Sequence, residues 1–306
     1  QARRRMEHGQ LLICNHALFF SDLALRSAGV GFLPAYDHVV LDEAHGVEDV
    51  ATEHFGASLA ESRVHHLLSM LLHEKTGKGF LGQLQTTGDE SDLKGRALAR
   101  VNEAYDAARV FFDEWVRYAG GGTLRAMTKR VREAGVVDNI ISPAFAQLAT
   151  SLRRAREVCA SEEDAYELSS YAERAQAVAV EAQLIVDQEL DGCAYWVEVS
   201  PTPGARSVRV TIAGSPVDVG PVLREKLFAG DHSVTLTSAT LTTGSKDQVG
   251  AFRHVASRIG FDLESAKSET LALGSPFEYS SQVELYVESS MPDPRDHSYD
   301  DALAAK

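Results

Sequence analysis

The chain has 306 residues, of which 44% are hydrophobic and 24% are charged, and it carries a formal net charge of −14. This composition is typical of a globular protein that is long enough for two domains with separate cores. No apolar run approaches the roughly 18 residues of a membrane span, and residues 1–5 lack the apolar stretch of a signal peptide. Three widely spaced cysteines without a C-x-x-C pair, Cys14, Cys159 and Cys193, argue against a disulfide framework and a complete metal cluster. We therefore expect a cytoplasmic protein without a membrane partner.

Two short apolar runs near the start of the chain, at residues 11–14 and 38–41, predict buried strands. Glycine and proline residues mark a loop between them, within residues 29–34. Two buried strands that lie so close in the sequence indicate a parallel sheet.

The second apolar run continues directly into the tetrad Asp42-Glu43-Ala44-His45. A buried strand that ends in two adjacent carboxylates places metal-binding and water-activating groups at the rim of a sheet, where nucleotide phosphates bind in P-loop enzymes. The alternative is that the two acids only end the strand and open the next helix with favourable dipole electrostatics. The full tetrad is rarer than a bare acidic pair and favours a nucleoside triphosphatase.

Helix-spaced apolar positions dominate the chain after the tetrad. The predicted helical segments are residues 54–74, 96–118, 143–159 and 162–190. Two strands with a turn between them are predicted at residues 195–199 and 207–212. A β-branched run at residues 233–237 predicts a third strand of the first sheet, roughly 200 residues after the second. Such a distance indicates that an inserted domain separates two parts of one α/β core.

The third strand runs into Ser238-Ala239-Thr240, so this segment and the tetrad each follow a strand of one predicted sheet. The two hydroxyls can hydrogen-bond the histidine ring or a carboxylate and so link the hydrolysis site to a second element. In this order, with a large helical insertion between them, the two segments resemble motifs II and III of superfamily 2 helicases of the DinG and XPD branch. Further segments that resemble DinG-type helicases are residues 11–18, 32–37, 46–51, 216–224, 274–279, 283–287 and 292–294.

The resemblance implies an α/β fold, with a RecA-like P-loop motor domain whose parallel sheet is incomplete and a large, mostly helical arch-type insertion. The implied divisions are residues 1–52 for the first part of motor domain 1, 53–205 for the insertion ending in a β-ribbon, 206–280 for the rest of motor domain 1, and 281–306 for the start of motor domain 2.

The resemblance also implies a role for each matching residue. Asp42 would hold the Mg²⁺ of ATP through water, and Glu43 would orient and deprotonate the attacking water. His45, Ser238 and Thr240 would couple the state of the nucleotide to movement on DNA.

Five residues are candidates for DNA contact. Asn15 and His16 stand in a segment that resembles the family's N-H-x-L sequence, and Arg125, Lys129 and Arg130 stand in a basic stretch. A structural role for the first two and solvated helix faces for the last three are the alternatives. The expected partner is single-stranded or forked DNA, held through backbone charge and base stacking by a monomer.

No G-x-x-x-x-G-K-[ST] sequence occurs in the chain, and the glycine-rich residues 76–79 follow no predicted strand. The resemblance therefore implies an internal segment of an ATP-dependent, 5′-to-3′ DNA helicase, which alone is not expected to hydrolyse ATP. The phosphate loop, and any iron–sulphur cluster, would come from upstream sequence. Two alternatives stay open: a non-enzymatic, helicase-derived DNA-binding or scaffold protein, and a different P-loop ATPase without unwinding activity.

Overall fold

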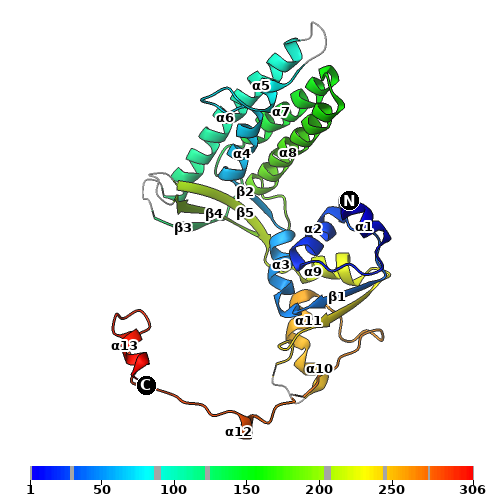
Figure 1. Ribbon diagram of the computed structural model, residues 1–306, viewed down its shortest axis with the longest axis vertical. Helices are drawn as coiled ribbons and strands as arrows, with labels where there is room; N and C mark the ends of the chain where they lie inside the picture. The colour runs from blue at the N-terminus through cyan, green and yellow to red at the C-terminus, as the bar shows by residue number, and fades with distance from the viewer. Residues whose placement is uncertain are drawn as a thin grey trace.

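The computed structural model describes residues 2–27, 31–85, 91–120, 125–202, 208–243, 247–274 and 276–305. Within these residues the chain forms a mixed α/β structure with a two-stranded parallel sheet and a four-stranded antiparallel sheet. Buried apolar residues form two separate clusters, and each cluster packs against one of the two sheets. We call these parts the parallel-sheet unit (residues 16–56 and 217–261) and the insertion unit (residues 57–216). Figure 1 shows the insertion unit as an elongated helical body above the smaller parallel-sheet unit.

In the parallel-sheet unit, β1 (His38–Asp42) pairs in parallel with β6 (Ser233–Thr237). The burial of β1 alternates along the strand, as expected for a sheet with one covered face. The prediction that these two distant segments are strands of one sheet is confirmed. The helices of this unit are α2 (His16–Ser27), η1 (Ala44–Gly46), α3 (Val47–His54), α9 (Gly220–Leu223), η3 (Arg224–Phe228), α10 (Gln248–Ala251) and α11 (Arg253–Ile259).

The prediction of a strand at residues 11–14 is wrong. These residues follow α1 (Ala2–His8) without regular structure, and Leu11 and Ile13 are 80% and 91% exposed. A strand must exchange backbone hydrogen bonds with a neighbour, and in the described part of the chain β1 and β6 pair only with each other. The apolar run therefore has no ladder to join.

In the insertion unit, the prediction of a helix over residues 54–74 is wrong for residues 57–60, which pair with another strand and form β2 (Ala57–Ala60). The four predicted segments otherwise contain the long helices of this unit. These helices are α4 (Glu61–Leu71), α6 (Ser91–Ala119), α7 (Ile141–Ala155, continued by η2, Arg156–Val158) and α8 (Glu162–Val186), with the short α5 (Phe80–Gln83) beside them. Their apolar faces meet in one core, where Phe112, Trp115 and Phe145 are buried. Ser161 accepts the backbone N–H of Asp164 and thereby caps the start of α8.

The antiparallel sheet has the order β2-β5-β4-β3. Its strands are β2 (Ala57–Ala60), β3 (Met127–Val131), β4 (Cys193–Pro201) and β5 (Val208–Pro216). The predicted β-ribbon corresponds to β4 and β5, and residues 203–207 of its turn lie outside the described residues. Strand β5 lies entirely after residue 205, where the sequence places the end of the insertion. Figure 1 shows the helices on one face of this sheet.

The chain after Gly260 contributes no buried residue within its described part. It contains α12 (Tyr279–Gln282) and α13 (Tyr299–Ala304), and Figure 1 shows it extending away from both units. The assignment of residues 281–306 to a second motor domain stays a prediction. Among the described residues, no helix is both long enough and apolar enough to cross a membrane.

Candidate functional site

The tetrad and the Ser238-Ala239-Thr240 segment leave the parallel sheet at the same edge. Parallel pairing places Asp42 directly opposite Thr237, the last residues of β1 and β6. The Thr237 hydroxyl donates to Asp42 Oδ1 at 2.6 Å. Two segments that lie far apart in the sequence are thus joined at the end of the sheet, where ligands bind in α/β proteins.

The Asp42 carboxylate is exposed and its pKa lies below the usual range. The largest cause is the hydrogen bond from Thr237, followed by the backbone N–H of Glu43, and the charge of His16 acts in the same direction. Each of these interactions favours the ionised form. Asp42 is therefore a carboxylate at neutral pH, which is the form that binds a divalent cation.

Glu43 has a left-handed backbone conformation, with φ 50° and ψ 45°. Such a conformation is unfavourable for a residue with a Cβ and is found where the surrounding structure imposes it, frequently at functional sites. Here the buried Ala44 and the bond from the Gly46 N–H to the Glu43 carbonyl, at 3.1 Å, hold the turn. The turn brings the side chains of Glu43 and His45 within 3.2 Å of each other.

Ser238 links these two side chains to the second segment. Its Oγ lies 3.1 Å from His45 Nδ1 and 3.3 Å from Glu43 Oε2, and it accepts the Thr240 N–H at 3.3 Å. One arrangement satisfies all three groups: His45 Nδ1–H donates to Ser238, and the Ser238 hydroxyl donates to Glu43. The structure therefore brings together all five residues assigned to hydrolysis and coupling. We call Asp42, Glu43, His45, Ser238 and Thr240 the carboxylate cluster.

Asn15 and His16 lie at the start of α2, on the side of the carboxylate cluster. Asn15 Oδ1 accepts the Leu18 N–H at 2.9 Å and caps the helix. His16 is the first helical residue, and its charge lowers the pKa of Asp42. These contacts give both residues a structural role at the site, and their contact with DNA stays a prediction.

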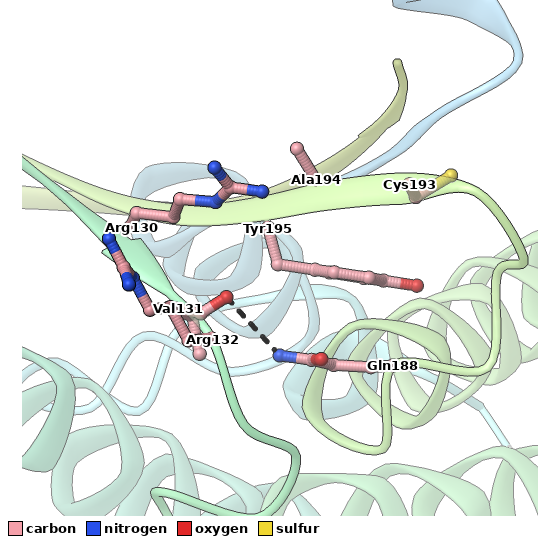
Figure 2. A pocket seen from close by; sticks show the side chains of 7 residues that line it. All are labelled: Arg130, Val131, Arg132, Gln188, Cys193, Ala194 and Tyr195. Carbon is pink, nitrogen blue, oxygen red and sulfur yellow. Dashed lines mark hydrogen bonds between the residues drawn. The ribbon is translucent and has the colours of Figure 1, made fainter. Parts of the chain in front are cut away.

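Arg125, Lys129 and Arg130 belong to the insertion unit and form a separate group, away from the carboxylate cluster (Figure 1). Lys129 donates to the Tyr118 carbonyl at 2.5 Å, and its Nζ lies 3.9 Å from the centre of the Tyr118 ring. Arg130 lines a cavity of about 280 Å³ between β3 and β4 (Figure 2). All three side chains are exposed.

The carboxylate cluster fits a Mg²⁺ ion that arrives with nucleotide phosphates. Protein sites for Mg²⁺ typically supply one or two carboxylates and leave the other positions to water and phosphate oxygens. Asp42 is such a carboxylate, ionised and open to solvent. In the part of the chain that the structure describes, no group of three or more His, Cys, Asp or Glu side chains could hold a metal ion by itself.

Sequence reasoning missed two features of this site. Thr237 is the residue that anchors Asp42, and its only signal is that it ends the β-branched strand just before Ser238. The left-handed conformation of Glu43 carries no sequence signal, because glycine or asparagine is the usual residue there.

No family model matches the chain. Among curated proteins, it is 25% identical over 294 residues to the ATP-dependent DNA helicase YoaA of Haemophilus influenzae, covering 95% of this chain and 40% of that protein. It is 26% identical to the YoaA helicase of Escherichia coli, with 95% and 41% covered, and 23% identical to the 3'-5' exonuclease DinG of Bacillus subtilis, with 95% and 33% covered. The chain thus spans about 40% or less of these relatives. It is a distant homologue of the YoaA and DinG proteins over most of its own length, so the resemblance to the DinG branch is confirmed.

Proposed function

We propose, from this distant homology, that the chain is part of an ATP-dependent DNA helicase that couples ATP hydrolysis to 5′-to-3′ translocation on single-stranded DNA and to duplex unwinding. In this proposal the parallel-sheet unit is part of a RecA-like motor domain, and the insertion unit is its arch. The observation that carries the proposal is the carboxylate cluster, in which hydrogen bonds join the tetrad to the Ser238-Ala239-Thr240 segment.

Two residues of the cluster act on the nucleotide. Asp42, ionised and fixed through one oxygen by Thr237, binds the cation through water. The Mg²⁺ ion, when bound, neutralises the charge that develops on the phosphates. Glu43 accepts the proton of the attacking water, and its left-handed backbone brings the carboxylate to His45 and Ser238.

The other three residues report the state of the nucleotide to the second segment. His45 contacts both Glu43 and Ser238, so a change in the position of Glu43 alters the bonds of the Ser238 hydroxyl. Thr240, whose N–H is held by Ser238, moves with it. Because these hydrogen bonds are exposed, each contributes little to the stability of the fold. Their role in this proposal is to orient the side chains relative to one another.

The proposed partner is single-stranded or forked DNA, bound by a monomer. Asn15 and His16 contact it beside the motor site, and Arg125, Lys129 and Arg130 contact it from the insertion unit. The parts of the ATP site that this chain does not supply, the phosphate loop and an arginine from a second motor domain, belong to the full-length protein in this proposal.

The test is Glu43→Gln in the full-length protein, with Glu53→Gln as the matched control. Glu53 is an exposed glutamate on the neighbouring α3, so the control makes the same chemical change outside the cluster. General-base catalysis contributes about 10²- to 10⁴-fold, so we expect ATP turnover to fall by at least about 100-fold while the Kd for ATP stays within about twofold. Unchanged turnover would refute the proposal. A wild-type protein that binds DNA without binding ATP would support the scaffold alternative instead.

A further inference from the structure

The face of the antiparallel sheet that points away from the helices carries an unusual set of side chains. On β4, Tyr195, Val197 and Val199 are buried against the helices, so Trp196 and Glu198 lie on the opposite face. Figure 1 shows the helices packed on one side of the sheet only. We call this opposite side the outer sheet face.

An arginine lies beside the tryptophan on the outer sheet face. Arg130 of β3 is directly opposite Trp196 of β4 in the ladder. Opposite residues on one face have Cβ atoms about 4.5–5.5 Å apart, so these two side chains are neighbours. Figure 2 shows the Arg130 side chain lying along β4 toward Ala194, and Arg132 lines the same cavity.

Within the described part of the chain, the arginines of this face have no acidic partner. Arg130, Arg132 and Arg209 are exposed and form no ion pair with any described residue, although the chain has 44 acidic and 30 basic side chains. The acid of the outer sheet face, Glu198, accepts the indole N–H of Trp196 at 2.7 Å. This bond fixes the orientation of the indole and leaves the arginines available to an anion.

The cavity that Arg130 and Arg132 line has a wall that is formed at a conformational cost. Gln188 follows the end of α8 with a φ of 53°, a position that usually belongs to glycine, and the Glu189 N–H donates to the Leu184 carbonyl as in a Schellman cap. The side-chain amide of Gln188 donates to the Val131 carbonyl at 3.4 Å and closes the cavity wall (Figure 2). A volume of about 280 Å³ lies at the lower limit of small-ligand sites, so the cavity suits a group such as a phosphate.

We propose that the outer sheet face is a stacking platform for single-stranded DNA. One unpaired base stacks on the indole of Trp196, and the adjacent phosphate is held by Arg130 and Arg132 at the cavity. Arg209 of β5 is opposite Ser200, four residues along β4 from Trp196, and it binds the DNA strand further along. Aromatic rings combined with arginines are the usual means of binding single strands without sequence preference. The proposal deepens the proposed function and rests on it, because it places the DNA on the insertion unit.

The first measurement follows the fluorescence of Trp196 during titration with oligothymidylate. These 306 residues contain two tryptophans, and Trp115 is 1% exposed in the insertion core, so in a protein of these residues Trp115→Phe leaves Trp196 as the only tryptophan. We expect quenching that saturates with binding. Because Trp115→Phe alters the core, the same titration is repeated by anisotropy of a labelled oligothymidylate with the unaltered tryptophans.

The second measurement uses substitutions in the anisotropy assay on the full-length protein. We expect Trp196→Ala to weaken binding roughly 5- to 150-fold, the range seen for loss of one stacked base. Arg130→Gln should reduce the slope of log Kd against log salt by about 0.7, the value for one phosphate contact of a single strand. The matched control is Arg153→Gln, an exposed arginine of α7, which should change neither quantity.

Three outcomes overturn the platform. One is wild-type affinity in both Trp196→Ala and Arg130→Gln, and another is tighter binding of duplex than of single strands. If either occurs while Glu43→Gln abolishes ATP turnover, the proposed function stands and only the location of the DNA is wrong. Failure of the wild-type protein to bind any DNA overturns both the platform and the DNA partner of the proposed function.

Discussion

Asp22 ties α2 to the loop that leads into β1, and we expect its loss to unfold the parallel-sheet unit selectively. Its side chain is fully buried, and its carboxylate accepts Arg26 Nε at 2.5 Å and the N–H groups of Phe32 and Leu33 at 2.6 and 2.8 Å. Arg26 in turn donates to the carbonyls of Leu33 and Pro34 at 2.7 and 2.9 Å. This network fixes the position of the helix whose first residue is beside Asp42.

The magnitude follows from the groups that Asp22→Ala leaves without a partner. Each buried donor that loses its acceptor costs about 1–3 kcal/mol, and breaking a buried ion pair costs about 3–5 kcal/mol. Because the side chain of Arg26 is 31% exposed, water replaces part of its lost interaction, and we expect a total near 4 kcal/mol. Asp22→Asn keeps the oxygen that faces Phe32 and Leu33, so it should cost about 1–2 kcal/mol.

Urea denaturation followed by two probes separates the units. Both tryptophans lie in the insertion unit, so their fluorescence reports on that unit, whereas far-ultraviolet circular dichroism reports on both units. We expect Asp22→Ala to move the dichroism transition of the parallel-sheet unit to lower urea concentration, while the midpoint of the fluorescence transition does not change. An equal effect of Asp49→Ala, an exposed aspartate of α3, or a shift of the fluorescence midpoint, would refute the assignment.

The pH dependence of stability provides an independent check on Asp22. Burial raises the pKa of this carboxyl, but the hydrogen bonds from the Leu33 N–H, Arg26 and the Phe32 N–H hold the pKa below its usual value. The folded pKa is thus lower than the unfolded value of about 3.9, so the stabilisation is complete above that value and is lost as the pH falls through the folded pKa. We expect acid unfolding of the parallel-sheet unit below roughly pH 4, with a smaller pH dependence in Asp22→Asn.

Three further substitutions test the carboxylate cluster and the packing beneath it. Ser238→Ala removes the hydroxyl shared by the tetrad's histidine and glutamate, so we expect DNA-stimulated ATPase of the full-length protein to fall several-fold while basal ATPase persists; an equal loss of both contradicts coupling. Thr237→Val removes the hydrogen bond that most lowers the pKa of Asp42, the proposed Mg²⁺ ligand, so the acidic limb of the pH–rate profile should move to higher pH, and an unmoved limb rejects the assignment. Gly260→Ala places a Cβ onto the Gly220 carbonyl, and the backbone there has a φ of 74°. We therefore expect the free energy of unfolding of the parallel-sheet unit, followed by dichroism, to fall by at least about 1 kcal/mol. A smaller loss would contradict the close packing of α9 on α11.

Sequence reasoning found the elements in which burial of one face imposes a regular pattern of apolar residues. Val101, Phe112 and Trp115 repeat at helical spacing because one face of α6 packs into a core. The strands that end at Asp42 and Thr237 are recognisable because apolar and β-branched runs are favoured in sheets. The meeting of the two motifs then follows from the parallel pairing of these strands.

What sequence reasoning did not find depends on neighbours rather than on local pattern. Residues 11–14 are as apolar as a buried strand, but the run itself does not reveal whether another strand is available to pair with it. Strand β3 has three exposed residues, Thr128, Lys129 and Arg130, so it shows no alternation that would reveal it. Similarly, the position of Arg130 opposite Trp196 depends on the register of the two strands, which the paired strands set together.

The way in which the insertion joins the sheet explains how both sites remain connected. The chain leaves the parallel-sheet unit through α3 and β2 and returns through β5, and these two strands are paired, with Ala57 opposite Gly214. A Cβ at Gly56 would lie 2.5 Å from the Gly214 carbonyl, and the Ser215 hydroxyl donates to the Thr52 carbonyl at 2.8 Å, so the two connections are packed tightly together. Because the ends of the insertion meet, it does not separate β1 from β6. The path from the carboxylate cluster to the outer sheet face therefore runs through α3, a helix that begins directly after the tetrad's turn and ends beside the antiparallel sheet.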